Sequence, residues 1–553
     1  MFYAPVPAIE RIAFRTGVPR TFPTVDTPAD QTYDLPNAGD QEPLAEYRIA
    51  NVKTSSVDKD ATAAVLKYAD FSHYADYFNG MEDENIAQAI PNAKASEWME
   101  ENIPLFECPQ RNFEEMYYYR WWSLRKHIKE TPVGYGMTEF LVQRSYSDKY
   151  NLIACAIGHH IYESRWLRDP KYLDQIIHTW YRGNDGGPMN KMNKFSSWNA
   201  DAVLARYMVD ADKDFMLDMK ENLEAEYQRW ECTNRLQNGL YWQGDVQDGM
   251  EESISGGRKK KYARPTINSY MYGNAKALSL MGILSDDEEM AMRYGMRADT
   301  LKRLVQDKLW NSRHQFFETM RADSSANVRE AIGYIPWYFN LPDIVKQYEV
   351  AWKEIMDENG FSAPYGLTTA ERRHPEFRTH GVGKCEWDGA IWPFASAQTL
   401  TAMANFMNNY PQRVLSDSVY FRQMELYVES QYHRGRPYIG EYLDEVTGYW
   451  LKGDQERSRY YNHSTFNDLM ITGLIGLRPR LDDTVEVNPL IPADKWDWFC
   501  LDNVLYHGRN LTILWDKYGD RYHRGKGLRI FVDGKQVGYA DRLTRIICEN
   551  VLK

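Results

Sequence analysis

Two acidic segments of this chain contain the residue types that sugar chemistry requires. The first runs from Asn238 to Gly273 and is centred on a glycine-containing loop that carries the carboxylates Asp245, Asp248, Glu251 and Glu252. Aromatic residues flank this loop on both sides. Flat aromatic faces can stack on a sugar ring, and a carboxyl group can protonate a glycosidic oxygen. A solvated acidic surface loop is the alternative interpretation of the same pattern.

The second segment, residues 437–464, supplies a further candidate carboxylate. Glu441 follows a glycine in a short extended stretch, and a cluster of Tyr, Trp, Arg and His residues closes the segment. Glycoside hydrolysis needs one carboxylic acid for the leaving oxygen and a second carboxylate to activate water or attack the sugar. Asp248, Glu251 and Glu441 are therefore candidates for these two roles, with Arg457 or Arg459 expected to hold Glu441 ionised.

Other residues near these segments are candidates for contacts with a sugar. The aromatic candidates are Trp198, Trp242, Tyr270, Trp387 and Trp392, and the polar ones are Asp201, Asp388, Arg457 and His463. Each also has a structural interpretation. A tryptophan can be a core residue, Asp388 can cap a helix N-terminus, Asp201 can hydrogen-bond among helices, and His463 can be a buried structural histidine.

Composition excludes several classes of function. The net charge of −12 argues against nucleic acid and anionic membrane surfaces as partners. The six cysteines form no C-x-x-C pair, so neither a disulfide framework nor a metal site is expected. Motifs for nucleotide, zinc-protease and serine-hydrolase chemistry are absent, and no cofactor is expected. No apolar run has transmembrane length, and the N-terminus lacks a signal-peptide pattern. We therefore expect a soluble protein, either cytoplasmic or exported with its signal peptide absent from this chain.

The elements that must position these residues are mainly helical. Apolar residues at helical spacing begin near Asn112, and a weaker element covers 327–340. The other helices are predicted at 152–166, 170–182, 196–209, 212–231, 267–282, 286–309, 342–356, 390–408, 414–430 and 463–475. About twelve helices in pairs, joined by loops of very uneven length, predict an (α/α)6 toroid. Both acidic segments fall in its long loops, and the sequence does not decide whether those loops share a face.

The two ends of the chain differ from this helical part. Residues 1–104 are predicted as an irregular N-terminal arm, because the first 80 or so are rich in Pro, Thr and Asp and show no helical period. After a helical domain at 105–480, residues 481–553 alternate with period two in several stretches. Asp533-Gly534 is a hairpin turn signal. This predicts a small C-terminal β module.

Several stretches together resemble a known group of enzymes. They are GHHIYESRWLRDPKYL, SSWNADAVLARYMVDADKDF, DGMEESISG, CEWDGAIWPFASAQTL, GEYLDEVTG and YYNHSTFNDL. In these the chain resembles the (α/α)6 glycosidases related to family 63 glucosidases, trehalases and mannosylglycerate hydrolases. The resemblance implies an inverting exo-glycosidase that acts on a small α-linked glycoside or oligosaccharide. The segment from Gly249 to Ser253 is similar to the motif that carries the general acid in these enzymes, with Glu251 in place of Asp. The resemblance therefore implies Glu251 as the acid, with Asp248 as its rival. Glu441, ahead of the turn from Asp444 to Gly448, is similar to the general base of these enzymes.

Three alternative functions remain open. A toroid polysaccharide lyase could use the run from Arg459 to His463, although a lyase favours a basic cleft and the chain is acidic. A glycoside phosphorylase would replace the base by a phosphate-binding cluster, which the retained Glu441 argues against. A sugar-binding relative without catalytic activity is the third.

Overall fold

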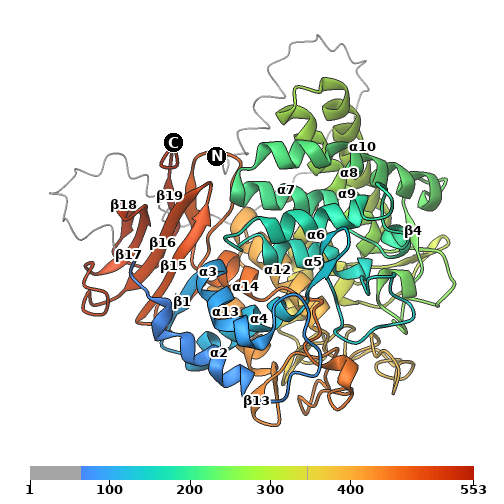
Figure 1. Ribbon diagram of the computed structural model, residues 1–553. Coiled ribbons are helices and arrows are strands. Elements are labelled where there is room, and N and C mark those ends of the chain that lie inside the picture. Colours follow the sequence, from blue (N-terminus) through green and yellow to red (C-terminus); the bar gives the residue numbers. More distant parts are fainter. Residues whose placement is uncertain (1–63, 345–346) are drawn as a thin grey trace, which may run out of the picture. The chain divides into compact units, whose positions relative to one another are not determined.

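The computed structural model describes residues 64–344 and 347–553 (Figure 1). These residues belong to one compact unit, Ile49–Lys553. The predicted N-terminal arm falls mostly on residues 1–63, outside the described part. The helices of the described residues include none that is both long and apolar enough to cross a bilayer.

A closed ring of helices forms the centre of this unit. In the described residues its members are α5 (Ile157–Ser164), α7 (Asn199–Asp210), α9 (Pro265–Leu284), α11 (Ile335–Tyr338), α12 (Pro393–Asn409) and α14 (Asn467–Leu469). The 3-10 turn Ala331–Tyr334 precedes α11, and the π-helical turn Met470–Leu474 continues α14. Each member contacts the next in this order, and α14 returns to α5. The ring is largely buried: in α9 every residue from Pro265 to Ala275 is buried, polar ones such as Asn268 included.

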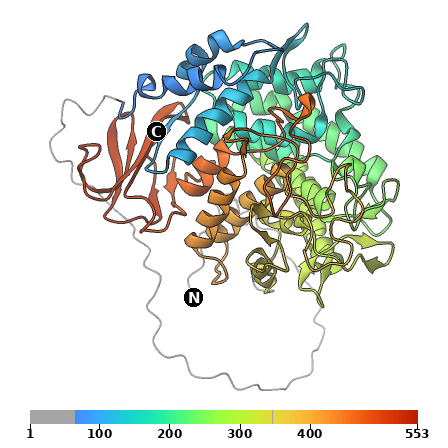
Figure 2. The ribbon, with the colours of Figure 1, turned by 90° about the horizontal axis from the view of Figure 1, so that it is seen from below.

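A second set of helices alternates with the ring along the chain and covers it from outside. They are α4 (Arg111–Lys126), α6 (Lys171–Arg182), α8 (Lys213–Asn234), α10 (Glu288–Lys308), the 3-10 helix η8 (Tyr348–Ile355) and α13 (Asp417–Glu429). Helix α8 buries a single stripe that includes Met216, Met219, Leu223, Tyr227 and Trp230, as expected of a helix with one face toward a core. The predicted (α/α)6 toroid is therefore confirmed. In Figure 2 the colours run around the helical part from blue through green and yellow to orange, and α13 meets α4.

The connections between ring and outer helices differ in length according to their direction. A ring helix passes to the following outer helix through a short turn, such as 211–212 or 285–287. An outer helix passes to the next ring helix through a long segment, such as 235–264 or 430–466. Because the helices form antiparallel hairpins, all long segments reach the N-terminal ends of the ring helices. Those ends share one face, and both acidic segments lie there.

The C-terminal module is a five-stranded antiparallel sheet with one strand from elsewhere in the chain. Its order is β1 (Leu105–Glu107), β15 (Trp498–Tyr506), β16 (Arg509–Asp516), β17 (Gly527–Val532) and β18 (Lys535–Ala540). A separate pair joins β14 (Val485–Val487) to β19 (Ile546–Cys548). The predicted hairpin turn at Asp533-Gly534 is confirmed, with φ of 48° and 75°. Strand β1 ties the sheet to the start of the helical part.

In the described part of the chain, two α-helices precede the first helix expected, near residue 112. They are α2 (Ser72–Asn79) and α3 (Ala95–Asn102), each eight residues long. A helix this short gives little periodic signal, and α2 is held by packing, with Tyr74 and Phe78 against rings of α4. The remaining strands form short ladders in the loops: β2 (Ile128–Thr131), β3 (Gly134–Met137), β4 (Trp242–Gln243), β5 (Tyr262–Ala263), β6 (Trp310–Asn311), β7 (Phe316–Phe317), β8 (Met320–Arg321), β9 (Ser324–Ser325), β10 (Ser362–Ala363), β11 (Gly366–Leu367), β12 (Tyr432–His433) and β13 (Arg436–Pro437).

Candidate active site

The first acidic loop is closed at its base by a β-ladder and by an aspartate. Strands β4 and β5 pair, so residues 244–261 form an excursion between them. The carboxylate of Asp245 accepts the backbone N–H of Val246 at 2.8 Å and that of Gly257 at 3.1 Å. Asp245 therefore joins the two ends of the excursion.

Backbone turns on either side of Glu251 fix its position at the tip of this loop. Gly249 has a φ of 75° and Glu252 a φ of 68°, both in the left-handed region. The carboxylate of Glu252 accepts from Nε of Arg258 at 2.9 Å, so it faces its own loop. Burial raises the pKa of Glu251 to about 7, and like-charge repulsion from Glu441 adds to the shift. At neutral pH a large share of Glu251 is protonated.

Asp248, the rival candidate for the acid, lies in a different environment. Its Oδ2 is 2.7 Å from Nε of Arg264, and both side chains are fully buried. The hydroxyl of Thr266 also donates to this oxygen. Because Arg264 and Thr266 stand at the start of α9, the ion pair fastens the acidic loop to the ring.

Glu441 reaches the same face from the segment before α14. Its Oε2 is 3.1 Å from Nη2 of Arg457 and 3.7 Å from Nζ of Lys452. Burial raises the pKa of the Glu441 carboxyl, while Lys452 and Arg457 oppose the shift. The two acidic segments lie close together, although they are far apart in the chain. The hydroxyl of Tyr442 donates to the carbonyl of Lys384 at 2.5 Å, and Nζ of Lys384 is 3.8 Å from the carboxylate of Glu252.

A third carboxyl group, Glu139, lies beside these two and was missed by the sequence analysis. It precedes α5, and Sγ of Cys155 donates to its Oε2 at 3.1 Å. Burial raises its pKa to about 8, and repulsion from Glu441 and Glu251 contributes. Glu139 belongs to no recognisable motif. The signal that could have found it is an isolated carboxylate in an otherwise apolar stretch.

The predicted tryptophans at 387 and 392 form one aromatic stack with a residue of the second acidic segment. The rings of Trp387 and Trp392 are 4.2 Å apart and nearly parallel, and Trp392 stacks on Tyr442 at 4.5 Å. Tyr442 is the neighbour of Glu441. The stack therefore joins the loop before α12 to the loop that carries Glu441.

Three of the other predicted contact residues point into the ring. Trp198 is fully buried, 4.7 Å from the ring of Tyr270, whose hydroxyl accepts from Gln398 at 2.7 Å. The ring of His463 packs on Tyr461, and its Nδ1 is 4.0 Å from Oε1 of Glu139. Burial holds the pKa of His463 well below its usual range, so the ring is neutral.

The last three predicted contact residues have structural partners. Oδ2 of Asp201 accepts from the hydroxyl of Tyr162 at 2.7 Å. Asp388 accepts two backbone N–H groups of the preceding loop, those of His380 and Gly381. Trp242 is partly exposed and lies under Nζ of Lys261 at 4.2 Å.

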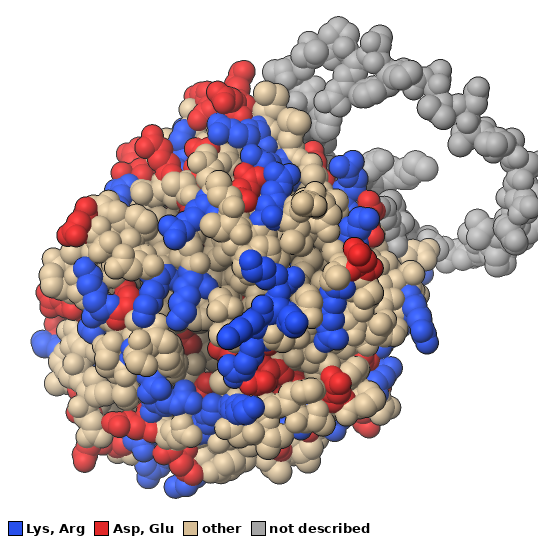
Figure 3. Space-filling view, turned by 90° about the vertical axis from the view of Figure 1, so that its right-hand side faces the viewer, with Lys and Arg blue, Asp and Glu red and all other residues tan. Residues whose placement is uncertain are grey.

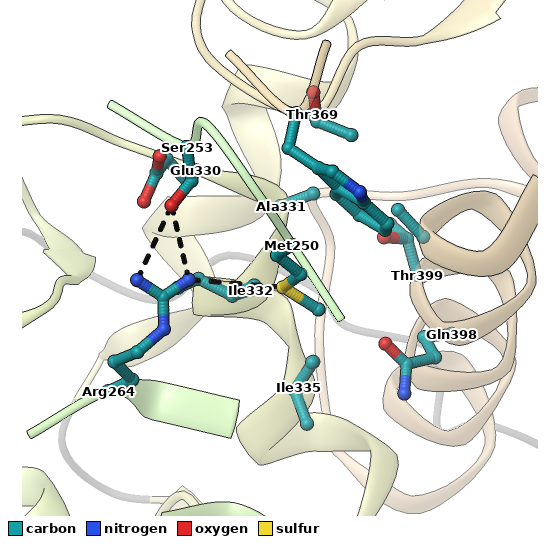
Figure 4. Close-up of a pocket in the computed structure, with 12 residues that line it drawn as sticks. Met250, Ser253, Arg264, Glu330, Ala331, Ile332, Ile335, Thr369, Gln398 and Thr399 are labelled. Carbon is teal, nitrogen blue, oxygen red and sulfur yellow. Dashed lines mark hydrogen bonds between the residues drawn. The ribbon is translucent and has the colours of Figure 1, made fainter. Parts of the chain in front are cut away.

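A small cavity lies behind the acidic loop (Figure 4). Met250, Ser253 and Arg264 line one side of it, and Trp387 and Gln398 line another. Glu251 and Glu441 are not part of its wall. The guanidinium of Arg264 is 3.4 Å from the Ser253 hydroxyl, so this wall is tied to the ion pair of Asp248. Among the described residues, no group of three His, Cys, Asp or Glu side chains is placed to hold a metal ion.

Comparison with known sequences identifies the domains of the chain. Residues 149–464 match the mannosylglycerate hydrolase MGH1-like glycoside hydrolase domain. Residues 477–538 match the C-terminal domain of glycosyl hydrolase family 65, and residues 1–31 match a sialidase-like CBM domain. The first match covers more than half of the chain. The protein therefore belongs to the MGH1-like glycoside hydrolase family and carries a glycoside hydrolase domain.

Several solved structures contain chains that are similar to this one. One named "Sialidase" is 90% identical, with a TM-score of 0.88 over 97% of this chain. This chain spans 50% of that longer one. The GH63 mannosylglycerate hydrolase from Thermus thermophilus, in complex with glucose, is 13% identical with a TM-score of 0.48, over 64% of this chain and 99% of its own. The GH78 rhamnosidase of Bacillus sp. GL1 is 11% identical with a TM-score of 0.48, over 75% of this chain and 40% of its own.

Proposed function

We propose that this chain is an inverting exo-glycoside hydrolase in which Glu251 is the general acid and Glu441 the general base. The observation that carries the proposal is the unequal environment of two interacting carboxyl groups. Glu441 is held by Arg457 and Lys452, which favour its anion. Glu251 has a pKa of about 7, which suits a proton donor at neutral pH. Two interacting carboxyl groups with different environments are typical of glycosidase acid and base pairs.

The chemistry then follows from the two roles. Glu251 gives its proton to the glycosidic oxygen as the bond between that oxygen and the anomeric carbon breaks. Glu441 takes a proton from a water molecule, whose oxygen forms the new bond to the anomeric carbon from the opposite face. Exchange with solvent returns the proton to Glu251 and removes it from Glu441. The resemblance of the sequence motifs to those of family 63 enzymes supports inversion and α-linkage.

Asp248 is less suited to be the acid in this proposal. Its Oδ2 is already engaged by Arg264 and Thr266 in a fully buried site. Breaking that ion pair to donate a proton would leave the Arg264 charge unpaired and buried. In the described part of the chain, Glu251 forms no ion pair that would be lost.

The lyase alternative is weakened by the partners of its candidate residues. Arg459 is 2.7 Å from a carboxylate oxygen of Glu82, and the hydroxyl of Tyr460 donates to the same carboxylate. Glu82 therefore engages both side chains, so neither is free to act beside Glu251. Of the run that could supply lyase chemistry, Tyr461 and His463 remain beside Glu139.

A screen of aryl-glycosides and disaccharides tests the proposal. We expect release of a single terminal sugar, and proton NMR of the first product should show the anomer opposite to that of the substrate. Retention of configuration would contradict the proposed mechanism. Activity that depends on inorganic phosphate would indicate a phosphorylase, and an unsaturated product seen by its ultraviolet absorbance would indicate a lyase.

A further inference from the structure

A phenylalanine at the start of α12 is surrounded by four other aromatic side chains of the helical ring. The centroid of the Phe394 ring lies 4.6 Å from that of His159, 5.9 Å from His463, 6.0 Å from Trp387 and 6.3 Å from Trp198. These residues lie close to the N-terminal ends of α5, α14, α12 and α7. They therefore meet inside the ring, toward the face that carries the two acidic segments. We name these five residues the ring-centre cluster.

Each of the four side chains around Phe394 has a buried polar atom without a hydrogen-bond partner among the described residues. These atoms are both ring nitrogens of His159, Nε2 of His463 and the indole nitrogens of Trp198 and Trp387. The four residues are at most 3% exposed. Buried polar groups in folded proteins are nearly always hydrogen-bonded, and an unpaired one is costly. So many in one place indicate a site whose partners come from a ligand.

The ring-centre cluster adjoins the cavity behind the acidic loop. Trp387 belongs to both, and Gln398 of α12 lines the cavity and has an unpartnered, buried Oε1. Met250, next to the candidate acid Glu251, lines the same cavity (Figure 4). Trp387 is also part of the aromatic stack that reaches the loop of Glu441. The cluster is therefore connected to both acidic segments.

The unpartnered atoms are a mixture of donors and acceptors, and none of them carries a charge. An indole N–H only donates, whereas a neutral imidazole has one nitrogen that donates and one that accepts. Burial holds the pKa of His159 and of His463 well below the usual range, so both rings are neutral. A hydroxyl group can donate and accept, so the hydroxyl groups of a sugar can pair with both kinds of atom.

The interior around Phe394 differs in charge from the surface near the acidic loop. Figure 3 views the molecule from the side on which β4 lies in Figure 1, and charged side chains of both signs are spread over that face. The ring-centre cluster contains no Lys, Arg, Asp or Glu. An acidic sugar would be buried there without a counter-charge, which is costly. The carboxyl group of Glu139, 4.0 Å from Nδ1 of His463, would also repel it whenever that carboxyl is ionised.

We propose that His159 and His463 bind two hydroxyl groups of an uncharged terminal sugar, and that Gln398 and the two indole N–H groups are further partners. The inference deepens the proposed function and rests on it. The two histidines are then determinants of specificity for the sugar that is released. Packing on Phe394 holds both imidazole rings in place before the sugar binds, so little side-chain entropy is lost on binding.

Binding of free monosaccharides tests this inference without any cleavage. The probe is a panel of neutral monosaccharides, each paired with its uronic acid, added to the full chain. A ligand that binds only the folded state raises the Tm. We expect at least one neutral sugar to raise the Tm and its uronic acid not to do so. Equal or greater stabilisation by the uronic acid, or no stabilisation by any member, overturns the proposal.

Variants that remove only the nitrogens connect the binding to the two histidines. His159→Phe and His463→Phe each keep an aromatic ring. We expect the Kd of the neutral sugar to rise about two- to tenfold in each, the scale of one neutral hydrogen bond. The Tm without sugar should not fall, because the lost atoms have no partner to leave unpaired. A lower Tm with an unchanged Kd would assign the histidines a structural role only.

The matched control is Tyr420→Phe in the outer helix α13. It also removes a buried polar atom that has no partner among the described residues, and it should leave the Kd unchanged. An equal rise of the Kd in the control and in the histidine variants contradicts a local role of His159 and His463.

Deoxy sugars test the same contacts in the wild-type chain, where no substitution can disturb folding. Each monodeoxy analogue of the bound sugar lacks one hydroxyl group. We expect the Kd to rise at least about tenfold for the analogues that lack a recognised hydroxyl, because the buried nitrogens are then left unpaired. If every monodeoxy analogue binds as tightly as the parent sugar, the hydroxyl groups are not recognised and the proposal is wrong.

The two proposals fail in different ways. If a neutral sugar binds through His159 and His463 but Glu251→Gln and Glu441→Gln leave hydrolysis unchanged, the proposed mechanism is wrong and the inference on binding stands. If Glu251 and Glu441 are required for hydrolysis and the histidine variants bind the sugar as tightly as the wild type, the inference is wrong and the proposed function stands.

Discussion

The guanidinium of Arg457 lies 3.1 Å from the carboxylate of Glu441, whereas Arg258, the arginine in the loop of Glu251, pairs with Glu252 instead. The two interacting carboxyl groups therefore have different electrostatic environments. The cation beside Glu441 favours the ionised form that a base requires. Burial raises the pKa of both carboxyl groups, and Lys452 and Arg457 oppose this for Glu441. Glu251 reaches a pKa of about 7, which suits an acid.

Replacing the base should strongly reduce turnover. Glu441→Gln keeps the shape of the side chain but cannot accept a proton, so we expect kcat to fall about 10²- to 10⁴-fold. Steady-state kinetics on the best substrate of the screen measure this. The matched control is Glu445→Gln in the adjacent turn, where the carboxylate pairs with Arg378. If Glu441→Gln retains wild-type kcat while the protein is active, Glu441 is not the base.

Replacing the acid should have an effect that depends on the leaving group. Glu251→Gln removes the proton donor, so we expect a natural glycoside to lose about 10²- to 10⁴-fold in kcat. An aryl or fluoride glycoside with a good leaving group needs little protonation and should lose much less. The ratio of the two losses is the measurement. If Asp248→Asn shows this ratio and Glu251→Gln does not, Asp248 is the acid.

The ion pair of Asp248 predicts an effect on stability. Asp248→Asn removes one partner of a fully buried pair and leaves Arg264 uncompensated, so we expect a loss of about 3–5 kcal/mol in the free energy of unfolding. Chemical denaturation measures it. Glu252→Gln is the control, because its pair with Arg258 is partly exposed and should be worth at most about 1 kcal/mol. Similar losses in the two variants would contradict a special role for the buried pair.

The activity should decline above about pH 7, because Glu251 must be protonated to act as the acid. Its pKa of about 7 sets the alkaline limb of kcat/KM for the free enzyme. In Glu251→Gln this limb should disappear from the residual activity on an aryl glycoside. A limb that stays at the same pH in this variant would assign the titration to another group.

Glu139 predicts how stability depends on pH. Its pKa is about 8 in the folded protein, against an ordinary value of 4.5, so the folded state binds the proton more tightly than the unfolded state. Its contribution to stability is therefore fully present below pH 4.5 and is lost as the pH rises through about 8. Glu139→Gln removes this term, so the free energy of unfolding should fall less between about pH 5 and pH 8 than in the wild type. Parallel pH profiles would contradict the shift.

Part of the site could be predicted from the sequence because it depends on local patterns. The glycine and the carboxylates around Glu251 are neighbours in the sequence, and a turn directly follows Glu441. The two acidic loops and the helices between them are therefore recognisable without a structure. The hairpin at Asp533-Gly534 is predictable for the same reason. The short helices α2 and α3 are not predicted, because eight residues carry too little periodicity.

Local patterns are enough to predict the toroid, the β module and the two loops with candidate carboxylates, since each is encoded by neighbouring residues. Which groups meet in space depends on the tertiary structure. Glu139 joins the site because the ring closes between α14 and α5, and Asp248 is engaged because α9 begins with Arg264 beside it. These contacts join residues of different segments, so no local sequence pattern encodes them.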